Sequence, residues 1–162
     1  MFGTPGSPQA LFQVGTISGK ILFTATFAVA SVDLTGGGST APTKTSTIAA
    51  VGPVISSLKL GARTTNSIEV LVSGYSNTRE LSQMVFTITG TPNSKITTGT
   101  VTANVQSAFA GWYQGTASQT YGSQFTASVV FNITGDLTTL QSIGVTATNG
   151  KGTSAAQSIT VN

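Results

Sequence analysis

The feature that most constrains the fold is a pair of segments in which apolar residues alternate with polar ones, on either side of the only tryptophan in the chain. The alternating residues are Val101, Ala103 and Val105 before Trp112, and Phe125, Ala127, Val129, Phe131 and Ile133 after it. A spacing of two places each set on one face of a strand, because successive side chains of a strand point to opposite faces. A face so apolar must be covered by a second sheet. The spacing therefore predicts strands over 95–106 and 124–134 in a layered β-structure.

The rest of the chain after Pro53 shows the same pattern. Abundant Thr and Val favour a pleated, half-buried backbone, and no long window places apolar residues at helical spacing. The other expected strands cover 54–60, 68–72, 84–88, 143–147 and 155–161, and Asn149-Gly150 is a strong hairpin signal between the last two. Roughly seven strands at these intervals are typical of a sandwich. We therefore predict an all-β, antiparallel β-sandwich over residues 53–162.

Residues 1–52 form a separate, incomplete unit in this interpretation. Alternation from Ile17 to Val32 predicts one long strand, and Thr45 to Val51 predicts a short one. This part supplies roughly three strands, fewer than a closed sandwich generally needs. Three alternatives stay open: the closing strands of a truncated module, additional strands of one larger sandwich, or a swapped arm that completes a neighbouring subunit.

The small number of strands expected in residues 1–52 predicts a binding partner. A sheet with too few strands exposes apolar faces and unpaired backbone edges, and a partner that adds strands covers both. The residues expected at this assembly interface are Ile21, Phe23, Phe27 and Val29. If the partner is a second copy, a head-to-tail contact repeats into a filament unless the rotation closes. With 7% charged residues, few like charges oppose such packing, so we expect a homo-oligomer or filament, or stacking on adjoining modules.

The amino-acid composition excludes several kinds of catalytic and metal-binding site. The chain has neither histidine nor cysteine, which removes Ser-His and Cys-His nucleophile pairs, disulfides and the commonest metal ligands, and its four acidic residues are scattered. We expect a non-enzymatic protein with no cofactor and no bound metal. The net charge of +3 comes from seven Lys and Arg without a run, which argues against nucleic-acid binding. The most apolar run, residues 21–30, is too short to span a bilayer, so no membrane insertion is expected.

Several short motifs carry a resemblance. They are Gly-Pro-Val-Ile at 52–55, Thr-Arg-Glu-Leu at 78–81, Ala-Phe-Ala-Gly-Trp-Tyr-Gln at 108–114, Tyr-Gly-Ser-Gln-Phe at 121–125 and Asn-Gly-Lys-Gly-Thr-Ser at 149–154. Together they resemble the immunoglobulin-like modules found in tandem in long bacterial cell-surface proteins. The likeness covers about 53–162, and residues 15–51 resemble the closing part of a similar module. It implies an immunoglobulin-like sandwich, an extracellular or cell-surface location, and a role as stalk, adhesin or filament subunit.

Aromatic residues supply the one candidate for ligand binding. Trp112, Tyr113 and Tyr121 could stack on sugar rings if their faces are exposed, which would make the protein a carbohydrate-binding or surface-binding adhesion module. The alternative is that Trp112 caps the open end of the sandwich, with Phe109 and Tyr121 packed beneath it. Earlier in the chain, Arg79 and Glu80 could be a ligand-facing pair, but we expect them to form a surface or loop-anchoring ion pair.

Overall fold

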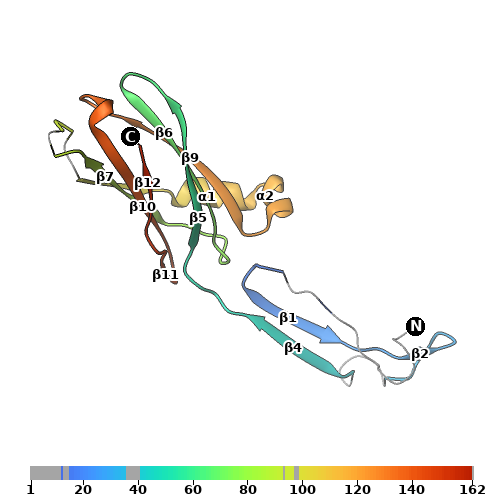
Figure 1. Ribbon diagram of the computed structural model, residues 1–162. Helices are drawn as coiled ribbons and strands as arrows, with labels where there is room; N and C mark the ends of the chain where they lie inside the picture. The colour runs from blue at the N-terminus through green and yellow to red at the C-terminus, as the bar shows by residue number, and fades with distance from the viewer. Residues whose placement is uncertain (1–11, 13–14, 36–40, 93, 97–98, 162) are drawn as a thin grey trace.

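The computed structural model describes residues 12, 15–35, 41–92, 94–96 and 99–161. The larger part of this chain, from residue 54 on, is built around two antiparallel sheets (Figure 1). The first sheet has the order β5-β6-β9, with β5 at Val54–Arg63, β6 at Ser67–Tyr75 and β9 at Gln124–Asn132. The second contains β8 (Gly99–Asn104), β7 (Gln83–Gly90) and β10 (Leu140–Asn149), and β10 also pairs with β11 (Gly152–Thr153) and β12 (Gln157–Thr160).

This topology confirms the predicted all-β antiparallel sandwich. The chain makes β5 and β6 in one sheet, crosses to make β7 and β8, returns for β9, and crosses again for β10 and β12. The fold is thus an antiparallel β-sandwich in which β8 is an edge strand of the second sheet.

The core lies between the two sheets and follows the alternation of the sequence. Inward positions of β6 are fully buried at Ile68, Val70 and Val72, and β10 buries every second residue from Ile143 to Ala147. Each buried Val or Ile side chain among them contributes about 1.5–3 kcal/mol relative to an exposed one. Across the core, Phe86 of β7 meets Phe131 of β9 edge to face, with ring centroids 5.0 Å apart. The predicted inward orientation of Phe131 is therefore confirmed.

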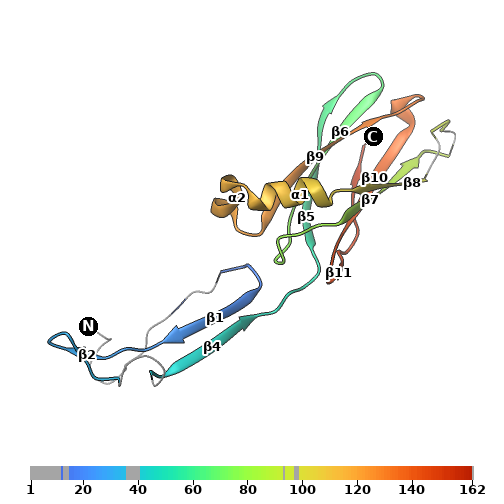
Figure 2. The same ribbon diagram turned by 180° about the vertical axis from the view of Figure 1, so that it is seen from behind.

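The connection from β8 to β9 differs from the prediction. The expected strand over 95–106 is shorter, and two helices follow it: α1 at Gln106–Gln114 and α2 at Thr116–Tyr121. The Asn104 side chain accepts a hydrogen bond from the backbone N–H of Gln106 at 3.1 Å, where the helix begins. Helix α1 buries only Phe109 and Tyr113, four residues apart, so tertiary packing rather than propensity holds it. Figure 2 shows both helices beside β9.

The expected long strand from Ile17 to Val32 is also wrong. Strand β1 spans only Gly19–Thr24 and pairs with β4 (Thr43–Ile48), and the tip beyond it holds a separate hairpin of β2 (Ala28–Val29) and β3 (Val32–Asp33). The chain reverses at Ala30 and Ser31, whose φ angles are 48° and 69°. Two-residue hairpin turns favour such positive φ angles because their twist matches that of the flanking strands.

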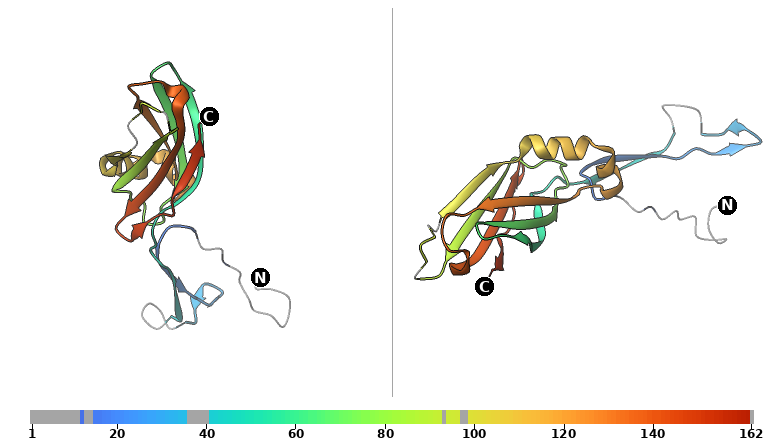
Figure 3. Two further views of the ribbon diagram at one scale, coloured as in Figure 1. Left: turned by 60° about the vertical axis from the view of Figure 1, so that its left-hand side comes forward. Right: turned by 90° about the horizontal axis from the view of Figure 1, so that it is seen from above.

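The ribbon of β1 and β4 with its tip, called the arm below (residues 15–48 as far as they are described), projects from one end of the sandwich (Figures 1 and 3). It forms its own two-stranded sheets, and no strand of the sandwich pairs with β1 or β4 in the described chain. Residues 49–53 link β4 to β5, and the boundary expected at 52 and 53 falls on this link. Among the residues that the structure describes, no helix is long and apolar enough to cross a membrane.

Candidate functional site

The tip of the arm carries an exposed apolar face. Val29 pairs with Val32 across the hairpin, and the backbone N–H of Leu34 donates to the carbonyl oxygen of Phe27 at 2.7 Å. Facing residues of an antiparallel pair, and residues two apart along a strand, share one face. The four side chains therefore form one group, the tip patch: Phe27 (56% exposed), Val29 (63%), Val32 (60%) and Leu34 (62%). Isolated exposed apolar residues are ordinary, but a contiguous group of four marks an interaction surface.

The body of the arm has a second apolar face. In the register of β1 with β4, Ile21 lies opposite Ser46 and Phe23 opposite Lys44 on the same face. Both apolar side chains are half-buried, and the ring of Phe12 packs edge-on against Phe23 with centroids 4.8 Å apart. The four predicted interface residues are thus divided between two places: Ile21 and Phe23 on the β1 ribbon, Phe27 and Val29 in the tip patch.

A hydrogen-bonded joint, missed by the sequence analysis, attaches the arm to the sandwich. The Asn77 side chain accepts from the backbone N–H of Val51 at 3.0 Å and donates to the carbonyl of Ala49 at 2.7 Å. The Asn77 main-chain carbonyl accepts from the N–H of Ser18 at 2.8 Å. One buried residue of the sandwich therefore contacts the chain segments on both sides of the arm, just before β1 and just after β4.

Asn149 holds the same link from the other sheet. Its side-chain amide donates to the carbonyl of Val51 at 3.0 Å and to the hydroxyls of Ser76 and Thr78 at 3.1 and 3.0 Å. Its side-chain oxygen accepts from the N–H of Lys151 at 2.8 Å. In the sequence, Asn149 is recognisable only as part of the Asn149-Gly150 hairpin signal. Nothing in the neighbouring residues indicates that its side chain also binds the link.

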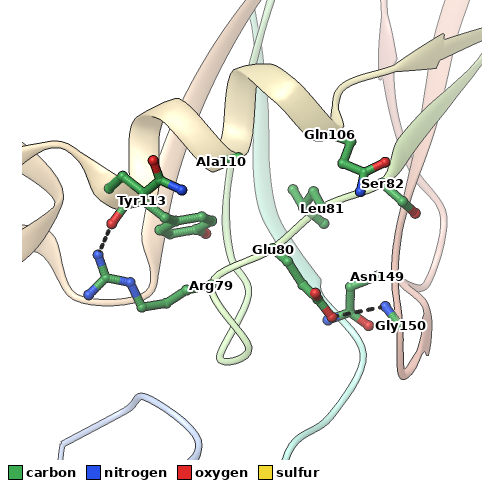
Figure 4. A pocket seen from close by; sticks show the side chains of 10 residues that line it. Arg79, Glu80, Leu81, Ser82, Gln106, Ala110, Tyr113, Asn149 and Gly150 are labelled. Carbon is green, nitrogen blue, oxygen red and sulfur yellow. Dashed lines mark hydrogen bonds between the residues drawn. The ribbon is translucent and has the colours of Figure 1, made fainter.

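An open cleft of about 540 Å³ lies beside this joint, between helix α1, residues 79–82 and the end of β10 (Figure 4). Arg79 donates to the carbonyl of Tyr113 and, at 2.9 Å, to the hydroxyl of Ser118, and its guanidinium lies 5.6 Å from the centre of the Tyr113 ring. Glu80 instead accepts from the N–H of Gly150 at 3.2 Å. The expected Arg79–Glu80 ion pair is wrong, because the two side chains bind opposite walls of this cleft.

Arg79 stabilises the end of a helix. Its charge lies at the last turn of α1, where unpaired carbonyls give the helix end a partial negative charge. The residue itself has a φ of 56°, a left-handed conformation that is rare for a residue with a Cβ atom. These contacts make Arg79 a structural clasp between residues 76–82 and the α1–α2 turn.

The three candidate aromatic residues separate into two environments. Tyr121 is 56% exposed and stacks on half-buried Trp112, with ring centroids 6.3 Å apart and 23° between the ring planes. The Trp112 indole N–H donates to the carbonyl of Gln124 on β9 at 3.1 Å. Trp112 packs against the core from the side of α1, as the capping alternative expected, but Tyr121 lies outside it rather than beneath it.

Tyr113, predicted as a possible ligand-binding residue, is buried instead. It is 6% exposed, its ring lies near that of buried Phe109, and its hydroxyl donates to the carbonyl of Ser123 at 2.9 Å. Burial raises the pKa of the Tyr113 phenol to about 12, against the opposing effects of a backbone hydrogen bond and the nearby Arg79 charge. Its face cannot stack on a ligand, because helix α1 turns it inward four residues after Phe109.

Two carboxylates of the sandwich, Glu69 and Asp136, accept hydrogen bonds within the fold. The Ser128 hydroxyl, and then the backbone N–H of Ala62, hold the pKa of Glu69 below its ordinary range. The Thr138 hydroxyl and N–H do the same to the pKa of Asp136, where the turn η2 (Leu137–Thr139) begins. In the described part of the chain no three metal-ligating side chains gather.

Comparisons with protein-family models, with curated proteins and with solved structures find no match for this chain.

Proposed function

We propose that the chain is a non-enzymatic structural protein whose arm packs onto the strands of another sandwich, in a second copy or an adjoining module, and so builds a stalk or filament. The observation that carries this proposal is the tip patch, whose four side chains are all more than half exposed. An isolated two-stranded ribbon is at best marginally stable in water, and the arm has only ribbons of this kind.

The sandwich itself supplies the pattern for what would cover the arm. Strand β10 places Ile143, Val145 and Ala147 at a spacing of two, and the facing sheet buries all three. Strand β1 begins the same kind of alternation with Ile21 and Phe23, and its partner β4 is antiparallel as β12 is to β10. The arm therefore has the strand arrangement of a closing hairpin that lacks a facing sheet. Strands of a second sandwich would bury its face at about 25 cal/mol per Å² of apolar surface.

The joint gives such a contact a direction. Asn77 and Asn149 hold the link at both Ala49 and Val51, so the arm leaves the sandwich at a fixed place rather than on a loose tether. The arm and the face it would bind are different surfaces of the molecule, which makes the contact head-to-tail. Repeated head-to-tail contacts make rows or helical filaments unless they close into a ring.

Composition supports the setting that we propose for such an assembly, the outside of a bacterial cell. Only 7% of the residues are charged, so repulsion between identical subunits is small, and the fold depends on no cysteine. The surface is instead rich in hydroxyl and amide side chains.

Sedimentation velocity over a range of protein concentrations, with electron microscopy of the largest species, tests the proposal. We expect concentration-dependent association of the wild-type chain, and its loss in Phe23→Asp, because the contact would have to bury a carboxylate in place of an apolar ring, which is costly even with Lys44 opposite it. Ala117→Asp is the control, since Ala117 is exposed on α2 and lies on no strand of the sandwich or the arm. Hydrogen exchange shows in the same samples whether β1 and β4 become protected.

The sandwich of Phe23→Asp should stay folded, because its core contains no residue of the arm. Two results would contradict the proposal: a wild-type chain that stays monomeric with arm amides as protected as those of β6, or a Phe23→Asp variant that assembles normally.

A further inference from the structure

A second surface, distant from the tip patch, is formed on the outward side of the β5-β6-β9 sheet. One hollow of about 410 Å³ is lined by Trp112, Tyr121 and residues 124–126, and another of about 440 Å³ by Ser56, Ser73, Tyr75 and the same residues 124–126. Because both share that stretch of β9, they form one surface, called the aromatic cleft below. It runs from the α1–α2 helices across β9 to β5.

The aromatic cleft has a tyrosine ring on each side of β9. Tyr121 presents an exposed ring stacked on Trp112, and Tyr75, 39% exposed, lies on the far side of β9. Trp112 is fixed in place by its indole hydrogen bond to Gln124. Rigid aromatic side chains provide a large contact area and lose little conformational entropy on binding.

Between the rings the lining is polar without charge. Gln124 and Thr126 are exposed on the outward face of β9, and the Thr126 hydroxyl lies 3.0 Å from that of Ser73. The Ser56 hydroxyl donates to the Ser73 carbonyl at 3.1 Å. Hydroxyl and amide groups both donate and accept hydrogen bonds, as the hydroxyls of a sugar do. None of the described residues that line the cleft is charged, so an acidic ligand would find no cation to pair with.

We propose that the aromatic cleft binds a neutral polysaccharide, with Tyr121 and Tyr75 stacking on sugar rings and Gln124 and Thr126 bonding to their hydroxyls. The cleft is an open surface rather than an enclosed cavity, which suits a chain molecule that continues beyond it at both ends. This inference does not rest on the assembly proposal, because the aromatic cleft contains no residue of the arm.

Intrinsic fluorescence is a direct probe, because the single tryptophan of the chain lies in this cleft. The wild-type chain is titrated with the neutral hexasaccharides cellohexaose, laminarihexaose and maltohexaose, and with an acidic oligogalacturonate. We expect saturable change with at least one neutral probe and none with the acidic probe. Tyr121→Ala should weaken that binding by about tenfold or more, while Tyr121→Phe, which keeps the ring, should retain most of it.

Val130→Ala is the matched control, since Val130 lies on the same outward face of β9 but does not line the cleft. Circular dichroism of each variant checks the fold, which exposed Tyr121 does not hold together. The proposal is overturned if no neutral probe binds up to about 10 mM, if the acidic probe binds as well as the neutral ones, or if Tyr121→Ala binds as tightly as the wild type. Because the Phe23→Asp variant keeps the cleft, loss of assembly and loss of sugar binding are separable.

Discussion

The side-chain oxygen of Asn77 accepts a hydrogen bond from the backbone N–H of Val51, 26 residues earlier in the chain, at 3.0 Å. Val51 also has its carbonyl bonded to Asn149, so both of its main-chain polar groups are satisfied by the sandwich. The apolar Val51 side chain itself is 48% exposed. The arm is thus held in place by amide hydrogen bonds to its backbone rather than by burial of this side chain.

Replacing this amide should loosen the arm without unfolding the sandwich. In Asn77→Ala, the N–H of Val51 and the carbonyl of Ala49 both lose their partner, and each lost bond to a part-buried group costs about 1–3 kcal/mol. Hydrogen exchange measured by mass spectrometry should show faster exchange at residues 49–51, while β6 and β10 stay protected. Asn132→Ala, an exposed asparagine at the end of β9, is the control. Unchanged exchange at 49–51 in Asn77→Ala would show that the joint is held by something else.

Arg79 should matter for the helices more than for the sheets. Arg79→Met keeps most of the side-chain length but removes the bonds to the Tyr113 carbonyl and the Ser118 hydroxyl. Charge-assisted hydrogen bonds contribute about 1.5–3 kcal/mol, so the free energy of unfolding should fall by about that amount. The midpoint of urea unfolding should therefore move to a lower urea concentration. Lys59→Met, at an exposed lysine of β5, should leave the midpoint almost unchanged. An equal change of the unfolding midpoint in Arg79→Met and Lys59→Met would show that Arg79 does not act as a clasp.

The buried phenol predicts loss of stability in alkali. The pKa of Tyr113 is about 12 in the folded protein and its ordinary value is 10.0, so the fold favours the neutral phenol. Stability from this group is fully present below pH 10 and is lost as the pH rises from there through the folded pKa. Urea unfolding across that range should show the decline, and Tyr113→Phe should lack this component. At neutral pH Tyr113→Phe should cost about 0.5–1.5 kcal/mol for the bond to Ser123. An equally steep alkaline decline in the variant would contradict the assignment.

Glu69 predicts the opposite dependence in acid. Its pKa is lowered from an ordinary 4.5 by the Ser128 hydroxyl and the Ala62 N–H, so folding favours the carboxylate. The stability is therefore present above pH 4.5 and is lost as the pH falls through the lower, folded value. A carbon-detected NMR titration should show the Glu69 pKa rising towards its ordinary value in Ser128→Ala. Ser107→Ala, at an exposed serine of α1, should not change it. A Glu69 pKa that is the same in wild type and Ser128→Ala would refute the stated cause.

The sequence-based expectations were correct where a local pattern of residues determines the structure, and wrong where the neighbouring residues do not reveal it. Strands β6 and β10 were predicted because alternation is a local property. The residues expected to point inward, from Ile68 to Val72 and from Ile143 to Ala147, are buried, whereas the burial of Asn149 was not expected. Helix α1 was missed because it is only nine residues long and buries only two side chains, Phe109 and Tyr113, so its apolar pattern covers a single pair at helical spacing. The turn between β2 and β3 was missed because the positive φ angles at Ala30 and Ser31 occur in residues that seldom adopt them.

By itself the sequence determined a sandwich of antiparallel strands, because residues two apart along a strand share a face and an apolar face must be covered. Only the tertiary structure decided that Tyr113 lies inside while Tyr121 lies outside, and that Asn149 binds a carbonyl 98 residues away. The reason is that these positions depend on where crossing strands and a short helix bring distant segments together. No window of neighbouring residues contains that information.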